Sequence, residues 1–293
     1  MNRVKNAMWP DDTQDEIKDK AETVIENAQK WFTANSLKIN PAKSEVMVFS
    51  GLRQSQEDLY IPVQDGNVRK FIKTSNSMKI LGVVVDNKLT WAKHISKVKQ
   101  LTHRTIANLA RTTHVLSLKS RRTLYDALVA PHFNYCDIVW DGASTTNSKA
   151  LQKTGNYAAR ALLGWKKRSS ATEALHQLNM MPLANKRTVH LGVFAHKIMQ
   201  SNGPRDLTER YKKMFTKTHG HHTRQAARQD MKTLTRRTAR FDSSTQCRAA
   251  QCWNSIPTDI RSIADTSSFK KRFQNFLLCK YKSDNECIQA SRK

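Results

Sequence analysis

Residues 79–95 are KILGVVVDNKLTWAKHI, and the hydrophobic pattern of the chain changes within them. Residues 78–85 are almost entirely apolar, which predicts a short strand buried on both faces. Asp86 and Asn87 favour the end of that strand. From Trp91 onward, apolar residues recur at the spacing of an α-helix. The chain is therefore expected to divide near Asp86 into a small piece with strands and a helical piece.

The piece before the division carries one helix and further strands. Apolar residues between 11 and 32 fall on one stripe of a helix, and acidic residues lie on its other face. Residues 46–49 are typical of a short strand. Alternation over 59–72, around a turn at Asp65-Gly66, predicts a β-hairpin. These segments predict a small antiparallel sheet.

The piece after the division is predicted to be mostly helical. Its expected helices are 91–109, 118–130, 147–163 with Gly164 just beyond, one capped by Ser170, 184–201, and a last one capped by Ser267 or Ser268. Residues 205–242 are rich in Lys and Arg, with few large apolar residues, which indicates a basic loop or arm. The predicted fold class is α+β, mostly α: a small antiparallel β piece, a helical domain and a basic C-terminal extension.

The charge of the chain is distributed unevenly. Residues 1–65 hold 8 Lys and Arg against 11 Asp and Glu, whereas residues 66–293 hold 42 against 13, which gives the chain a net charge of +26. A surface this positive favours a polyanionic partner, and nucleic acid is the usual one. An anionic membrane is the alternative, but no basic helix with an aromatic face stands out, and the apolar run at 80–85 is too short to span a bilayer. We therefore expect a nucleic-acid partner and no membrane.

The five cysteines favour reduced thiols. Their number is odd and no Cys-x-x-Cys pair occurs, so an intracellular location, nucleus or cytoplasm, is expected. Cys247 and Cys252, with His219, His221 and His222, leave zinc binding as an alternative. Their spacing is not that of a regular zinc site, so buried thiols are favoured and no metal ligand is assigned.

Seven motifs occur in order along the chain. They are WFTANSLKINPAKSEVMVF at 31–49, KILGVVVDNKLTWAKHI at 79–95, NYC at 134–136, LQKTGNYAAR at 151–160, LHQL with MPL between 175 and 183, CWNSIPTDIR at 252–261, and SFKKRF at 268–273. In this order they resemble the C-terminal half of the reverse transcriptases of non-LTR retrotransposons, of the jockey and chicken-repeat-1 kind. The resemblance covers essentially the whole chain.

The resemblance implies a domain assignment. Residues 1–86 are similar to the end of a polymerase palm, with a primer-grip-like strand at Lys79–Asp86, and residues 87–204 are similar to a helical thumb. Residues 205–242 would be a basic loop or arm, and residues 243–293 a C-terminal extension. Because the chain opens directly in helix-like sequence, a fragment or a truncated reading frame is expected.

The resemblance also implies a reaction, DNA synthesis templated by RNA, which depends on Mg²⁺ in the parent enzyme. Two-metal phosphoryl transfer needs carboxylates from two separate palm strands, and the first of these is not in this sequence. Asp11 and Asp12 are candidates for the second set, and Lys43 for a cation near the incoming nucleotide. Polar flanks and Pro10 favour a helix N-terminus for the two aspartates instead, and a surface position is favoured for Lys43. The chain alone is expected to be inactive and to need no cofactor.

Basic residues of the helical piece are candidates for nucleic-acid binding. Residues 87–130 hold 9 Lys and Arg against the single acid Asp126, an excess beyond what solubility needs. The candidates are Lys93, Lys97, Arg104, Arg121, Arg122, Arg160, Arg236, Arg237, Lys270, Lys271 and Arg272. For Arg160, capping of polar core groups is an equal alternative.

Five aromatic residues have the same ambiguity between nucleic-acid binding and packing. They are Trp91, Trp140, Tyr157, Trp165 and Trp253. Exposed rings at these positions would stack on bases, but helical spacing beside Leu and Ile favours a place in the core.

The preferred function is therefore that of a reverse-transcriptase fragment that holds an RNA template and DNA primer through the phosphate backbone. RNA or an RNA–DNA hybrid is the expected partner, together with the missing palm and endonuclease parts of the polyprotein. The alternative is a stand-alone, non-catalytic nucleic-acid-binding protein, or a decayed element without function.

Overall fold

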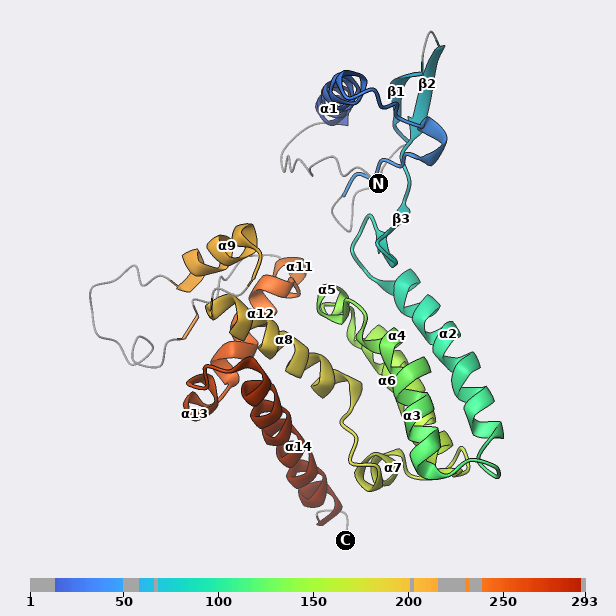
Figure 1. Ribbon diagram of the computed structural model, residues 1–293, viewed down its shortest axis with the longest axis vertical. Coiled ribbons are helices and arrows are strands. Elements are labelled where there is room, and N and C mark those ends of the chain that lie inside the picture. The colour runs from blue at the N-terminus through green and yellow to red at the C-terminus, as the bar shows by residue number, and fades with distance from the viewer. Residues whose placement is uncertain are drawn as a thin grey trace, which may run out of the picture. The chain divides into compact units, whose positions relative to one another are not determined.

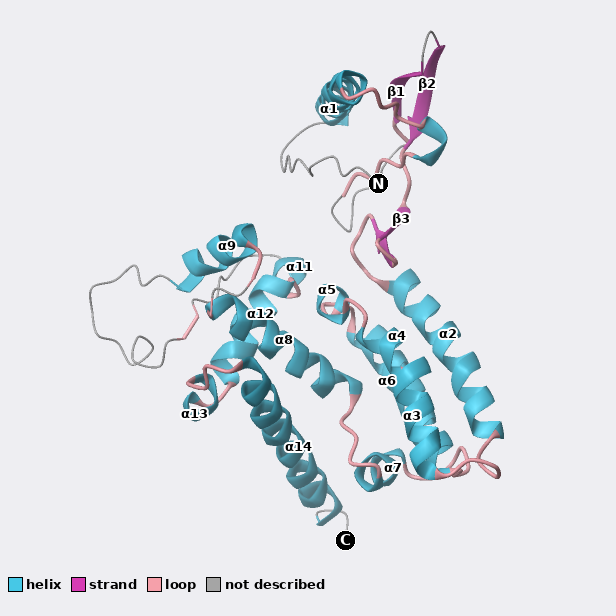
Figure 2. Cartoon of the chain, in the orientation of Figure 1, coloured by secondary structure: helices cyan, strands magenta, loops and turns pink. Residues whose placement is uncertain are grey.

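The computed structural model describes residues 14–49, 58–65, 68–200, 203–215, 230–231 and 239–290. Within these residues the protein is mostly helical, with two small antiparallel sheets (Figure 1, Figure 2). This confirms the predicted class, α+β and mostly α. The chain forms two compact units, Met1–His94 and Ile95–Lys293.

The first unit combines one long helix with two β-hairpins. Its elements are α1 (Gln14–Ala34), the 3-10 turn η1 (Pro41–Lys43), β1 (Tyr60–Asp65), β2 (Val68–Lys73), β3 (Ser77–Ile80) and β4 (Val83–Asp86). β1 and β2 pair in antiparallel register, and α1 packs against β1. Alternation along the strands places Ile61, Val63 and Ile72 on one buried face. The helix and the hairpin predicted from apolar spacing are thereby confirmed.

Two local predictions for this unit are wrong. Residues 46–49 form no strand, and within them Val46 alone makes a bridge, to Thr74, beyond the end of β2. Ser75 N also donates to Val46 O at 2.8 Å, and the chain bends at Asn76 before β3 begins. Asp65 pairs with Val68 and therefore belongs to β1 instead of the turn expected there.

The apolar stretch at 78–85 forms a tight hairpin instead of the single strand that the sequence predicts. β3 and β4 are antiparallel, with Ile80 opposite Val83. The turn has positive φ at both Leu81 (46°) and Gly82 (91°), a backbone that matches the right-handed twist of the strands. Glycine adopts this conformation without strain, which explains how an apolar run reverses direction. Leu81 is 59% exposed at the turn, so burial on both faces is also a wrong expectation here.

Asp86 ends β4 and organises the start of helix α2 (Ala92–Arg111). Its buried carboxylate accepts hydrogen bonds from the backbone N–H groups of Thr90 (2.9 Å) and Trp91 (2.8 Å). His94 Nδ1 accepts one from Val84 N at 3.3 Å, so the hairpin and the first turn of α2 are joined within the first unit. The division between the two units falls inside α2, after His94, and the palm and thumb assignments on either side of Asp86 stay predictions.

The second unit is helical in the residues described. After α2 its helices are α3 (Leu118–Leu128), α4 (Ala130–Asn134), α5 (Asp137–Trp140), α6 (Thr145–Leu163), α7 (Ala171–Gln177), α8 (Leu183–Met199), α9 (Arg205–Phe215), α11 (Ala239–Asp242), α12 (Thr245–Ser255), α13 (Thr258–Arg261) and α14 (Thr266–Ala290). The two predicted helix caps are confirmed. Ser170 Oγ accepts a hydrogen bond from Glu173 N at 3.2 Å at the start of α7. Gly164 ends α6 with a φ of 73°. The last helix is capped instead by Asp265, whose carboxylate accepts from Ser268 N at 2.7 Å.

Helix α8 lies at the centre of one hydrophobic core of this unit, and α12 and α14 pack along it (Figure 1). His196 of α8 is fully buried, stacked on Phe269 at 4.2 Å, with Nε2 2.7 Å from Ile263 O. The cluster around it includes Leu191, Ala195, Ile198, Trp253, Ile256 and Phe273. One core is therefore shared between the segment predicted as thumb and the segment predicted as C-terminal extension.

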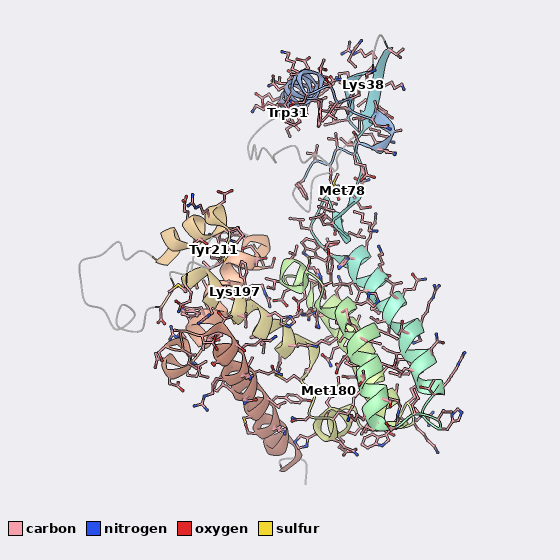
Figure 3. The ribbon with its side chains drawn as sticks, in the orientation of Figure 1. Trp31, Lys38, Met78, Met180, Lys197 and Tyr211 are labelled. Carbon is pink, nitrogen blue, oxygen red and sulfur yellow. The ribbon has the colours of Figure 1, made fainter. Side chains whose placement is uncertain are left out.

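Residues 205–215 form helix α9, although the sequence predicts a basic loop across 205–242. Thr208 and Tyr211 are buried, and Figure 3 labels Tyr211. The Tyr211 ring meets Phe194 of α8 edge-on, with centroids 5.7 Å apart. One buried stripe is enough to hold a charged helix against a core. The composition of this segment, rich in Lys and Arg, therefore did not reveal that it begins with a helix.

The aromatic residues weighed for base stacking lie mostly inside. Trp91, Trp140 and Trp253 are buried, which confirms the core interpretation for these three. Tyr157 and Trp165 are half-buried, and Tyr157 stacks with His103 of α2 at 5.1 Å between centroids. Trp165 packs against a small cluster formed by Ala159, Ala174 and Leu175.

Candidate nucleic-acid interface

Helix α2 has two opposite faces. Its buried face is formed by Ile95, Val98, Thr102, Ile106 and Leu109. Three cations of the second unit that succeed one another by whole helical turns lie on the opposite face, because of the 3.6-residue period. They are the predicted candidates Lys97 and Arg104, with Arg111, and they are called the α2 basic face below. The candidate Lys93, one turn earlier in the helix, belongs to the first unit. The helix contains no acidic residue.

The α2 basic face is open to solvent. Lys93, Arg104 and Arg111 are exposed, and Lys97 is half-buried. Lys93, in the first unit, donates from Nζ to Ser77 Oγ at 2.9 Å. Within the part of the chain that the structure describes, Lys97, Arg104 and Arg111 form no ion pair. Their charge is therefore not neutralised by neighbouring side chains there.

Arg122 and Arg160 hold helix ends together in the second unit. Arg122 donates from Nε to Asp126 Oδ2 (3.2 Å) and from Nη1 to the carbonyl oxygen of Leu178 (3.2 Å). Arg160 Nη1 donates to the carbonyl oxygen of Ser169 at 3.4 Å. Both candidates thus make contacts within the protein, and their role in nucleic-acid binding stays a prediction.

Arg121 lies beside the C-terminal end of α6. A Cβ on Gly164, the residue that ends this helix, would be 3.9 Å from Arg121 Nη1. The loop that follows holds Lys166, Lys167 and Arg168, all exposed. These three were not among the predicted candidates, although a run of three cations was a readable signal. The structure brings them to the same end of α6 as Arg121.

Lys270, Lys271 and Arg272 form a separate basic group on α14. All three are exposed, whereas Phe269 and Phe273 beside them are buried in the core. The helix that carries them, α14, packs on α8 (Figure 1). Arg236 and Arg237 fall outside the described residues.

The candidate catalytic residues stay predictions. Asp11 and Asp12 fall outside the described residues. Lys43 is exposed in η1, whose start is capped by Asn40 Oδ1, an acceptor for Ala42 N at 3.0 Å. Among the residues that are described, no group of three or more His, Cys, Asp and Glu could hold a metal ion.

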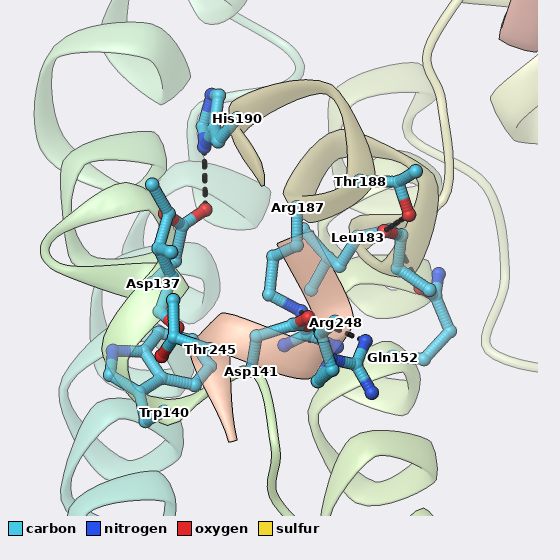
Figure 4. Close-up of polar contacts among 12 residues, drawn as sticks. Asp137, Trp140, Asp141, Gln152, Leu183, Arg187, Thr188, His190, Thr245 and Arg248 are labelled. Carbon is cyan, nitrogen blue, oxygen red and sulfur yellow. Dashed lines mark hydrogen bonds and ion pairs between the residues drawn. The ribbon is translucent and has the colours of Figure 1, made fainter. Parts of the chain in front are cut away.

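A buried ion-pair cluster that the sequence did not predict joins three helices (Figure 4). Asp141 lies just after α5, and its carboxylate forms ion pairs with two arginines. Arg187 of α8 contacts it with Nε 3.0 Å from Oδ1, and Arg248 of α12 donates from Nε to Oδ2 at 2.8 Å. The Arg187 guanidinium also lies over the Trp140 ring at 5.3 Å. Burial lowers the pKa of Arg187, and Asp141 opposes that shift. Arg187 therefore has a structural role, as the buried partner of Asp141.

The two cysteines weighed for zinc are buried on α12. Burial raises the pKa of the Cys252 thiol to about 12, and its Sγ lies 3.6 Å from the carbonyl oxygen of Thr188. Zinc binds the thiolate form, which such a pKa disfavours. The three histidines of that alternative fall outside the described residues. In the described helices there is no stretch long and apolar enough to cross a membrane.

Comparison with known proteins supports the resemblance carried by the motifs. Over 159 residues, 52% of this chain, the sequence is 29% identical to the “Probable RNA-directed DNA polymerase from transposon X-element” of Drosophila melanogaster. The match covers 16% of that relative, so the chain corresponds to a minor part of its length. No family model and no solved structure matches the chain. The motifs and this match together support a relationship of the chain to the reverse transcriptases of non-LTR retrotransposons.

Proposed function

We propose that this chain carries the end of a reverse-transcriptase palm and a thumb-like helical domain, and that it holds an RNA template paired with a DNA primer. The contact is with the sugar–phosphate backbone. The relative is described as an RNA-directed DNA polymerase, which supports the class of substrate. The chain alone has no polymerase activity in this proposal, because only one of the two sets of palm carboxylates has a candidate in it.

The α2 basic face is the observation that carries the proposal. From Lys97 to Arg111 it extends about 21 Å along the helix, at 1.5 Å per residue. A hybrid duplex is recognised mainly by shape and phosphates, and Lys and Arg side chains in a row suit such contacts. Each phosphate neutralised also releases counterions, so binding should weaken steeply with salt.

A binding assay with charge-matched variants tests the proposal. The probe is a fluorescently labelled RNA–DNA hybrid, and Kd is measured by anisotropy over a range of salt. The test variant is Lys97→Gln/Arg104→Gln/Arg111→Gln. The control variant removes three other exposed lysines of the second unit, Lys149→Gln/Lys153→Gln/Lys197→Gln (Figure 3 labels Lys197).

The test variant is expected to lower the slope of log K against log salt by about 2 to 3, at about 0.9 per phosphate contact. The control variant should change the slope much less. Equal losses would mean that net charge alone drives binding, and would contradict a defined face. Salt-insensitive or absent binding by the unmodified chain would favour a decayed element.

Primer extension separates the polymerase fragment from an active enzyme. With Mg²⁺, template, primer and nucleotides, no incorporation by the chain alone is expected. Incorporation that is lost in Asp11→Ala/Asp12→Ala would overturn this part of the proposal.

A further inference from the structure

The β1–β2 hairpin has one face that the core of the first unit does not use. Ile61, Val63 and Ile72 occupy the inner face and are buried. Alternate residues of each strand point to the opposite side of a sheet. By the register these are Tyr60, Pro62 and Gln64 of β1 and Arg69, Phe71 and Lys73 of β2, called the hairpin outer face below.

Two aromatic rings are exposed on the hairpin outer face. Tyr60 is 51% and Phe71 is 59% exposed. Because Tyr60 pairs with Lys73 and Pro62 pairs with Phe71, the two aromatic residues are diagonal neighbours across the strands. Such neighbours lie about 7–8 Å apart, close enough to act on consecutive units of one ligand.

A cation accompanies each ring. The Arg69 guanidinium lies 5.9 Å from the Phe71 ring centroid, and Lys73 Nζ lies 6.0 Å from that of Tyr60. Lys73 also forms a 2.7 Å ion pair with Asp58, and both side chains are about half exposed. The hairpin outer face thus alternates flat apolar surface with positive charge.

This alternation suits one class of ligand. A protein that covered the rings would also have to bury Arg69 and Lys73, at a cost in desolvation that one exposed aspartate does not offset. A duplex keeps its bases stacked inside and has no free ring faces to offer. Single-stranded nucleic acid supplies both partners, since its bases stack on aromatic rings and its phosphates pair with the cations between them.

We propose that the hairpin outer face is a binding site for single-stranded RNA or DNA, with bases stacked on Tyr60 and Phe71 and phosphates held by Arg69 and Lys73. This inference deepens the proposed function and rests on it for the nucleic-acid partner. It assigns the unpaired strand to the hairpin, whereas the duplex is assigned to α2.

The test uses two probes of equal length, a labelled single-stranded oligouridylate and a labelled blunt RNA–DNA hybrid. The variant Tyr60→Leu/Phe71→Leu keeps apolar volume on the sheet and removes the stacking rings. Trp31→Leu is the control, because Trp31 of α1 is a 58% exposed aromatic residue of the same unit (Figure 3). Circular dichroism of each variant checks that the fold is retained.

For single-stranded RNA, the double variant should raise Kd about tenfold for each ring removed, and Trp31→Leu should leave it within about twofold. Affinity for the hybrid should change little in both variants. Unchanged single-strand binding by the double variant would overturn the site, and would point to a protein as occupant of the rings. The proposed function would still stand if Lys97→Gln/Arg104→Gln/Arg111→Gln weakened binding of the hybrid while Tyr60→Leu/Phe71→Leu did not.

A second pair of variants tests the cations. Arg69→Gln/Lys73→Gln should lower the salt slope of single-strand binding by about 1.4, at about 0.7 per phosphate contact. Asp58→Asn should tighten binding, because it frees Lys73 and removes a negative charge beside the rings. Weaker binding in Asp58→Asn, or an unchanged slope in the double variant, would contradict phosphate contact at this face.

Discussion

Arg187 of α8 lies with Nε 3.0 Å from Oδ1 of Asp141, and both side chains are buried. Arg248, 107 residues further along the chain from Asp141, reaches the other oxygen of the same carboxylate. This cluster ties α5, α8 and α12 together. The region that follows residue 243 is therefore part of the same folded unit as the helices before residue 204.

Asp141→Ala should destabilise the second unit by about 3 kcal/mol, because it leaves the buried Arg187 without its counter-ion. Urea denaturation followed by far-ultraviolet circular dichroism measures the change. Asp141→Leu/Arg187→Met removes both charges and should recover most of the loss. A double variant as unstable as Asp141→Ala would contradict the ion-pair explanation.

Gly192→Ala in α8 should also destabilise the protein, by about 1–3 kcal/mol. In an exposed helix this change is usually favourable by about 1 kcal/mol. Here the new Cβ would lie inside contact distance of the Phe273 ring, with Cδ1 at 3.0 Å. A rescue by Phe273→Leu, seen as a recovered thermal midpoint, would confirm that overpacking is the cause.

Asp265 should make the stability of α14 depend on pH. Hydrogen bonds from Ser268 and from the backbone lower the pKa of its carboxyl group in the folded state. The stability that Asp265 contributes is therefore present above the pKa of this carboxyl group in the unfolded chain, about 3.9. It is lost as pH falls through the lower pKa of the folded state. Asp265→Ala should be less stable than the unmodified chain at pH 7, and the difference should vanish at the lowest pH. A difference that persists there would show that the carboxylate is not its source.

Arg104 and Arg122 should respond differently to the same substitution. Arg122→Gln should lower stability by about 1 kcal/mol, because it removes hydrogen bonds to Asp126 and to the Leu178 carbonyl. Arg104→Gln should leave stability unchanged and weaken hybrid binding. Parallel unfolding and anisotropy measurements on both variants decide whether binding and structural arginines are distinct in this helical unit.

Local features of this protein were determined by the sequence itself. The two faces of α2, the Ser170 cap and the β1–β2 hairpin depend on neighbours within a few residues, so their period and chemistry are readable along the chain. The relationship to reverse transcriptases also came from the order of the motifs.

Other features were decided only by tertiary structure. The reversal at Gly82 depends on positive φ at two residues, which hydrophobic pattern does not encode. Helix α9 packs on α8 through the buried ring of Tyr211. The carboxylate of Asp141 forms ion pairs with Arg187 and Arg248, which are distant from it in the sequence. Arg69 and Phe71 lie together on an exposed face of the hairpin, and which of its two faces is exposed depends on which one is buried in the core. Each depends on contacts between distant segments, and such contacts exist only once the chain has folded.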